Sequence, residues 1–150
     1  MRFHLIDRLD LVEPGQRVRG RKLTSWAEEY WRDTGQGPEM PPPLVLESLC
    51  QAATWLVMAT TGFRLRAALL SIDEVHWDGP VRPGDVLELD GTVESMSDEM
   101  AVLSGTAAVG TRTVLRAGAV MCALIPADDL EDPDAVSRMY EELTMQGSDR

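Results

Sequence analysis

The chain has 150 residues, of which 44% are hydrophobic and 26% charged, as is typical of a single globular domain. Its formal net charge of -11 argues against nucleic acids and anionic membrane surfaces as partners, because both repel an acidic protein. The chain lacks an uninterrupted run of about 18 apolar residues, and its charged N-terminus lacks the apolar core of a signal peptide, so we expect a cytoplasmic protein.

The N-terminal part of the chain predicts a β-hairpin. Residues 3–12 and 16–24 form two strand-like segments on either side of Pro14-Gly15. This pair is a strong turn signal, because proline presets its own φ and glycine accepts a positive φ. The next stretch, 25–43, contains several glycines and a triple proline, and it predicts an irregular segment.

A long helix is predicted to begin near Pro42 and to end near Gly62. Proline is tolerated in the first turn of a helix, and glycine commonly follows the last turn. The segment is apolar on almost every side, which is typical of a buried helix. Its polar exceptions include Glu47, Gln51 and Thr54, which are spaced four and three apart and therefore share one face.

The rest of the chain predicts four further strands and a short helix. The strands are expected at residues 66–77, 86–96, 100–110 and 113–125. Short antiparallel strands around one long helix indicate an α+β architecture. We therefore expect one domain over residues 1–126, followed by an acidic C-terminal extension over 127–150. Within this extension, Asp132 can cap a short helix that begins at Pro133.

The two cysteines, Cys50 and Cys122, lie in apolar stretches and do not have the spacing of metal ligands. They are interpreted as small core residues, and neither a metal nor a cofactor is predicted. The two histidines, His4 and His76, are interpreted as partly exposed strand residues.

Three motifs occur in the same order as in a known family. The first is FHLIDRLDLVEPG at 3–15, the second is PEMP followed by LVLESLCQA at 38–52, and the third is IDEVHW followed by PVRPGD at 72–85. Together they resemble the 3-hydroxyacyl-(acyl-carrier-protein) dehydratases of fatty acid and polyketide synthesis, the FabA- and FabZ-like proteins. The resemblance implies a hot-dog fold, in which an antiparallel sheet wraps one central helix, and a dimer with its sites at the subunit interface.

The resemblance also implies roles for individual residues. Glu47 matches the carboxylate that handles the departing 3-hydroxyl, and Gln51 matches the glutamine that follows it. The family histidine, which removes the α-proton, falls at Asp33. The glycine whose N–H stabilises the thioester oxygen falls at Pro42, which has no N–H.

Both a base and an oxyanion donor are thus replaced. Since Pro43 also lacks an N–H, Leu44 carries the first helix amide, and Met40, Pro42 and Leu44 would lie near the substrate. The alternatives for the two acids are that Asp33 caps a turn or substitutes as base, and that Glu47 is a buried acid held by a structural hydrogen bond.

The function implied is that of a dehydratase-like protein with a degenerate site, which acts on or binds thioesters of acyl-carrier-protein or CoA. It would form a homodimer or higher oligomer, or a heterodimer with a catalytic paralogue. The alternative is an active 3-hydroxyacyl-thioester dehydratase or an acyl thioesterase that uses Glu47, with Asp33 or a partner-chain residue.

Three arginines alternate along one predicted strand, at Arg17, Arg19 and Arg21. This basic stripe could receive the acidic surface of a carrier protein. It could equally be a solvated strand face or form salt bridges at an interface.

Overall fold

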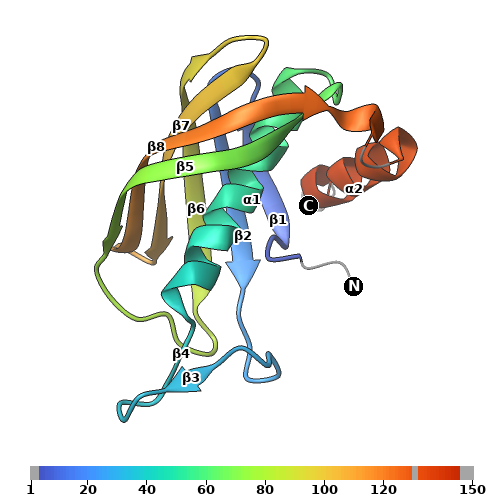
Figure 1. Cartoon of the computed structure of the whole chain (residues 1–150). Helices are drawn as coiled ribbons and strands as arrows, with labels where there is room; N and C mark the ends of the chain where they lie inside the picture. Colours follow the sequence, from blue (N-terminus) through green and yellow to red (C-terminus); the bar gives the residue numbers. More distant parts are fainter. Residues whose placement is uncertain (1–3, 130–131, 146–150) are drawn as a thin grey trace.

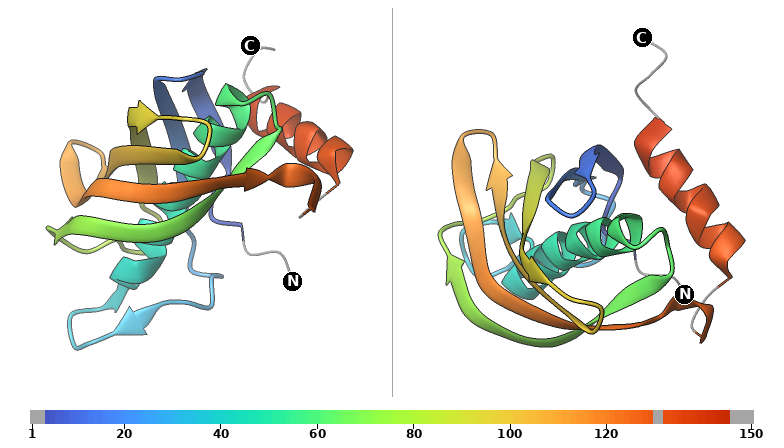
Figure 2. Two further views of the ribbon diagram at one scale, coloured as in Figure 1. Left: turned by 45° about the horizontal axis from the view of Figure 1, so that its top comes forward. Right: turned by 90° about the horizontal axis from the view of Figure 1, so that it is seen from above.

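The computed structural model describes residues 4–129 and 132–145, in which a long helix lies in the concave face of a curved antiparallel sheet. The helix, α1, spans Pro42–Thr60. Figure 2 shows the sheet curling around it from one side. This arrangement confirms the α+β, hot-dog architecture that the sequence predicted.

The main sheet has six strands in the order β1-β2-β6-β7-β8-β5, and each neighbouring pair is antiparallel. The strands are β1 (Arg8–Glu13), β2 (Arg17–Leu23), β5 (Leu65–Trp77), β6 (Val86–Met96), β7 (Met100–Val109) and β8 (Arg112–Pro126). Strand β5 therefore lies at one edge of the sheet, with only β8 beside it.

The first strand begins at Arg8 and not at residue 3 as predicted; residue 3 itself lies outside the described residues. The reason is that the preceding segment turns toward α1. The N–H of Leu5 donates to Oε1 of Gln51 at 2.8 Å, and the side chains of Leu5 and Ile6 are buried. Residues 4–6 thus contact the helix and do not extend the sheet.

The stretch predicted to be irregular contains a small hairpin of two-residue strands, β3 (Arg32–Asp33) and β4 (Pro38–Glu39). One Asp33 carboxylate oxygen, Oδ1, accepts the N–H groups of Gly35 and Gly37 at 2.8 and 3.2 Å. Both glycines adopt a positive φ, which a turn of this kind requires. Strands this short leave no alternating pattern in the sequence.

The core forms between α1 and the inner face of the sheet, where Val45, Ala52 and Leu56 are fully buried. The helix approaches the sheet closely at Gly105. A Cβ atom there would lie 2.6 Å from the backbone oxygen of Asp90 on the neighbouring strand and 2.9 Å from Cδ1 of Leu49, so this position has no room for a side chain. By length and composition alone α1 could cross a membrane, but here it is the core helix of the domain.

A second helix, α2 (Pro133–Met145), follows β8 and the short 3-10 turn η1 (Ala127–Asp129). As predicted, Asp132 caps it, since Oδ1 accepts the N–H of Asp134 at 3.0 Å. The helix packs beside the C-terminal part of α1 (Figure 2). The division of the chain at residue 126 stays a prediction, and residues 130–131 and 146–150 of the extension lie outside the described residues.

Candidate functional site

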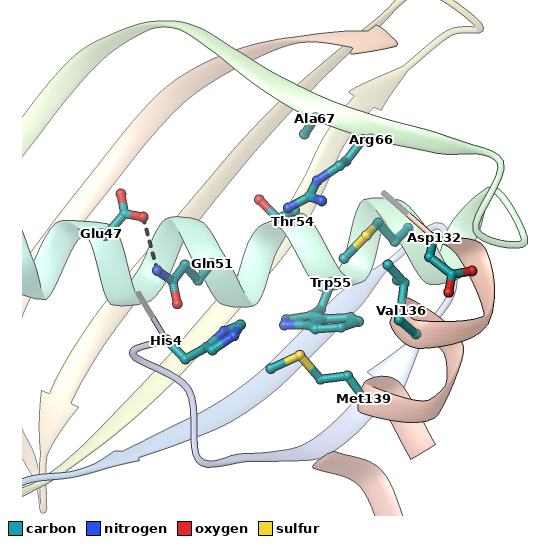
Figure 3. Close-up of a pocket in the computed structure, with 12 residues that line it drawn as sticks. His4, Glu47, Gln51, Thr54, Trp55, Arg66, Ala67, Asp132, Val136 and Met139 are labelled. Atoms are coloured by element: carbon teal, nitrogen blue, oxygen red, sulfur yellow. Dashed lines mark hydrogen bonds between the residues drawn. The ribbon is translucent and has the colours of Figure 1, made fainter. Parts of the chain in front are cut away.

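A cavity of about 350 Å³ lies beside α1, between strand β5, helix α2 and the N-terminal segment. Figure 3 shows the side chains that surround it. Those that matter for its chemistry are His4, Glu47, Gln51, Trp55, Arg66 and Met139. The polar face predicted for α1 therefore lines this cavity.

Glu47 and Gln51 are joined by a hydrogen bond, in which Nε2 of Gln51 donates to Oε1 of Glu47 at 3.0 Å (Figure 3). The other end of the Gln51 amide, Oε1, accepts the N–H of Leu5 at 2.8 Å. The two bonds fix the orientation of the amide, and the amide orients the carboxylate. Glu47 is exposed, so it is not the buried acid that the sequence left as an alternative.

A second cavity, of about 190 Å³, lies between α1 and the sheet, and Glu47, Gln51 and Thr54 line it as well. Cys50 and Cys122 also lie on its wall. Burial, with a smaller effect of the Glu47 carboxylate, raises the pKa of the Cys50 thiol to about 11. Burial likewise raises the pKa of the Cys122 thiol. Both sulfurs are therefore thiols at neutral pH, which does not suit a nucleophile.

The start of α1 offers few amides to a ligand. Pro42 and Pro43 occupy its first two positions and have no N–H. The next two N–H groups, of Leu44 and Val45, both donate to the carbonyl oxygen of Pro41, at 2.9 and 3.3 Å. The amide that the sequence identified as the first available one, that of Leu44, is thus already bonded within the helix.

The other predicted site residues do not line the two cavities next to Glu47. Asp33 lies in the β3–β4 hairpin, where its carboxylate binds turn amides. Met40 is fully buried, and its N–H donates to the carbonyl oxygen of Val81 at 2.8 Å. Among the predicted residues, Glu47 and Gln51 are brought together, whereas Asp33, Met40 and Leu44 lie elsewhere in the same chain.

Sequence reasoning missed two contributors to the cavity, His4 and helix α2. His4 is exposed and lies on the cavity wall in the segment that Gln51 holds against α1. It was interpreted as a strand residue, and no motif connects it to Glu47. In α2, Val136 and Met139 line the cavity, whereas the sequence predicted a short helix here without indicating what it would contact.

The arginine stripe on β2 is paired with carboxylates of the neighbouring strands. Nη2 of Arg17 lies 2.8 Å from Oδ2 of Asp90, and Nε of Arg19 lies 3.5 Å from the same oxygen. Nη2 of Arg21 lies 2.8 Å from Oδ1 of Asp10. These pairs neutralise much of the positive charge that the sequence suggested for this surface.

Within residues 4–129 and 132–145, no group of three or more His, Cys, Asp or Glu side chains is arranged to hold a metal ion. Glu47 can exchange a proton with a bound hydroxyl, and the imidazole of His4 can act as a base.

Comparison of the sequence with known proteins finds FabA- and FabZ-like proteins. The profile of the FabA-like domain matches residues 1–118. The 3-hydroxyacyl-(acyl-carrier-protein) dehydratase FabZ of Lactobacillus helveticus is 37% identical over 97 residues, which are 63% of this chain and 66% of that protein. The FabZ dehydratase of a Roseiflexus species is 35% identical over 124 residues, which are 81% of this chain and 86% of that protein.

Solved structures share the fold at low sequence identity. A Streptococcus mutans protein bound to acetyl CoA superposes with a TM-score of 0.63 and 16% identity, over 84% of this chain and 92% of that one. A chain of the dehydratase heterocomplex ApeI:P from Xenorhabdus doucetiae gives a TM-score of 0.63 and 11% identity, over 91% of this chain and 89% of that one.

Proposed function

The chain belongs to the FabA-like family, and from this premise we propose that it binds acyl thioesters of carrier protein or CoA at a dehydratase-like site that has lost two catalytic groups. The acyl group would lie in the cavity beside Glu47. The fold and the relatives support a dehydratase- or thioesterase-like protein of thioester metabolism. The loss of catalytic activity is proposed from the residues of this chain.

The start of α1 is the observation that carries this proposal. Removal of an α-proton places negative charge on the thioester oxygen, and a backbone N–H at a helix N-terminus can stabilise that charge. Here two prolines lack the N–H, and the amides of Leu44 and Val45 are bonded to Pro41. The absence of one such donor typically lowers the rate by roughly 10²–10³.

The residue at the position of the family's catalytic base also supports a loss of dehydratase activity. Asp33 stands where the family has its histidine, and its carboxylate is bonded to the N–H groups of Gly35 and Gly37. Loss of general base catalysis typically lowers the rate by about 10²–10⁴. With both effects combined, dehydration by the family's route would be very slow.

Binding of the thioester is supported by what the site retains. The carboxylate of Glu47, oriented by Gln51, can accept a hydrogen bond from a 3-hydroxyl group. Further along α1, Trp55 and Met58 give the cavity an apolar wall that suits an acyl chain. The Streptococcus mutans protein of the same fold was solved with acetyl CoA bound, which agrees with a thioester as ligand.

A second candidate function is dehydration that uses Glu47 with His4, and it is favoured by their presence on the wall of one cavity. The imidazole of His4 would take the α-proton, and the C–O bond to the 3-hydroxyl would break. A protonated Glu47 would give its proton to the departing oxygen, so that water and an enoyl thioester form. The two side chains would then exchange their protons through solvent.

We also propose that the chain assembles through β5, as a homodimer or with a catalytic paralogue. Strand β5 is long and lies at the sheet edge, and Leu69, Leu70 and Val75 on it are exposed. An edge of this kind readily pairs with a second strand. The Xenorhabdus heterocomplex shows that chains of this fold occur in assemblies of two kinds of subunit.

The test combines a binding measurement with a turnover measurement. The purified chain is titrated with 3-hydroxyacyl-CoA thioesters in a calorimeter, and the same mixtures are followed by ultraviolet absorbance for the enoyl product and with a thiol reagent for released CoA. We expect saturable binding without either product. The variants Glu47→Gln and His4→Gln are measured in parallel.

The outcomes separate the candidates. Enoyl formation that both variants abolish would replace the degenerate site with the Glu47–His4 dehydratase. Release of free CoA that depends on Glu47 would identify a thioesterase. If the wild-type chain binds no acyl thioester, the proposed function is wrong.

A further inference from the structure

Helix α2 lies beyond the part of the chain that the FabA-like profile matches, since the match ends at residue 118 and α2 begins at Pro133. The helix nevertheless contributes to the wall of the cavity that holds Glu47. A helix outside the part that the profile matches therefore shapes this cavity (Figure 3).

The position of α2 is fixed by aromatic contacts with the end of α1. The ring of Tyr140 lies 6.0 Å from that of Trp55 and 5.0 Å from that of Phe63, the second pair in an edge-on arrangement. One turn further along, Leu143 is only 8% exposed. Contacts of this kind stabilise a docked helix, so α2 forms a fixed wall of the cavity.

The lining of the cavity changes along the axis of α1. Glu47 and Gln51 lie at one end, with His4 beside them, toward the start of α1 (Figure 3). Met58 lies eleven residues after Glu47, roughly 16 Å further along the helix axis at 1.5 Å per residue. Ala135, Val136 and Met139 of α2 line the farther part of the cavity, and the charged side chains of Arg66 and Asp132 line the cavity as well.

We infer that α2 closes the end of the acyl-binding cavity that lies farther from Glu47 and thereby limits the length of the acyl chain that the protein accepts. This inference rests on the proposed function, because it assumes that the thioester lies at the end near Glu47. The side chains at positions 135 and 139 would be the ones that determine chain length.

The inference predicts how affinity depends on chain length. Each methylene group that enters an apolar cavity contributes about 0.8 kcal/mol, or roughly a fourfold gain in affinity. The gain should continue while the chain extends along α1 and should stop when the chain reaches α2. A narrower or wider end should shift that limit in opposite directions.

The test measures the dissociation constants of acetyl-, butyryl-, hexanoyl-, octanoyl- and decanoyl-CoA by calorimetry for four proteins. These are the wild type, Ala135→Leu to narrow the cavity, Met139→Ala to widen it, and Glu141→Leu as the control. Glu141 is exposed on the far side of α2 from Met139. All three replacements introduce good helix formers, so α2 should persist, and circular dichroism checks this.

We expect the chain length of tightest binding to become shorter in Ala135→Leu and longer in Met139→Ala, while Glu141→Leu behaves as the wild type does. An unchanged length profile in both folded cavity variants would overturn the inference and leave the proposed function intact. The same shift in Glu141→Leu would also overturn it. If the wild type bound none of the five thioesters, the proposed function itself would fail, and this inference with it.

Discussion

The first two residues of α1 decide, at the scale of single residues, what the helix N-terminus can bind. Proline at these positions suits the helix, because an N–H there has no intrahelical acceptor. The same property makes such an N–H useful to a ligand, since it is free to donate. In this chain Pro42 and Pro43 therefore favour the helix at the expense of an anion site.

A double substitution tests this reasoning. In Pro42→Gly the new N–H would lack an intrahelical acceptor, and Asp33→His would return an imidazole to the position where the family has one. We expect the combination to produce enoyl thioester at a rate at least tenfold above that of the wild type, followed by ultraviolet absorbance. This expected rate increase is smaller than the roughly 10²–10³-fold that one native oxyanion donor contributes. The reason is that the loop that carries residue 33 must move before a histidine there can act as the base.

The matched control is Pro43→Gly with Asp33→His, which adds an N–H one position away from the expected site of the thioester oxygen. This variant should stay as slow as the wild type. If the Pro42 variant binds thioester and is folded yet forms no enoyl product, the assignment of these two positions is wrong.

The partly buried thiol of Cys50 provides a prediction about pH. Its pKa is raised from 9.0 to about 11 in the folded chain, mainly by burial, so the folded state keeps a proton that the unfolded state releases. The stabilising effect is complete below pH 9 and is lost as the pH rises toward 11. In this window the free energy of unfolding should fall with a slope approaching 1.4 kcal/mol per pH unit.

Urea unfolding at several pH values measures this slope. Cys50→Ala should reduce it, because the alanine side chain does not titrate. Burial also raises the pKa of Cys122, so part of the slope should remain in this variant. An identical slope in wild type and Cys50→Ala would contradict the assignment to this thiol.

At the scale of elements, strands β1 and β6 place carboxylates beside the arginine stripe of β2. Asp90 on β6 lies between Arg17 and Arg19, and Asp10 on β1 pairs with Arg21. All these groups are partly exposed, so each pair contributes little to stability. Their larger effect is on the electrostatic potential that an approaching partner meets. Docking of a carrier protein on this stripe remains a proposal.

Asp90→Asn separates the two effects. We expect the free energy of unfolding to change little, while the affinity for an acidic acyl-carrier-protein at low salt rises. The gain should disappear at high salt, because exposed charges are screened. Asp98→Asn, in an exposed turn, makes the same change of net charge and is the control. Equal gains in the two variants would reject the stripe as the docking surface.

The elements show which features the sequence could predict. Helix α1 and strands β5 to β8 follow from hydrophobic pattern and from Pro and Gly at their ends, and Glu47 and Gln51 follow from the family motif. The β3–β4 hairpin is too short to produce a pattern. The position of His4 and the side of α2 that lines the cavity depend on contacts between distant parts of the chain. The periodicity of the sequence does not encode such contacts. The same holds for the pairing of Arg17 with Asp90, which depends on the register of β2 against β6.

At the scale of the whole molecule, β5 leaves one edge of the sheet open. Over Leu65–Trp77 it pairs with β8 alone and carries exposed apolar side chains, whereas interior strands such as β6 have neighbours on both sides. The second cavity, next to Glu47, reaches this edge at Ala67 and Leu69. A partner strand on β5 would therefore cover the edge and lie close to the candidate site.

Leu70→Lys tests this assembly, because a charged side chain on an edge strand opposes pairing with another strand. We expect the wild type to form a dimer in light scattering after size exclusion, and the variant to shift toward the monomer at the same concentration. Leu23→Lys is a matched control, since Leu23 is 52% exposed and Leu70 59%, and Leu23 lies at the end of an interior strand. A monomeric wild type, or an equal shift in both variants, would contradict assembly through β5. If the variant is a folded monomer that also binds thioesters more weakly, the partner subunit helps to complete the site, as expected from the closeness of Leu69 to the Glu47 cavity.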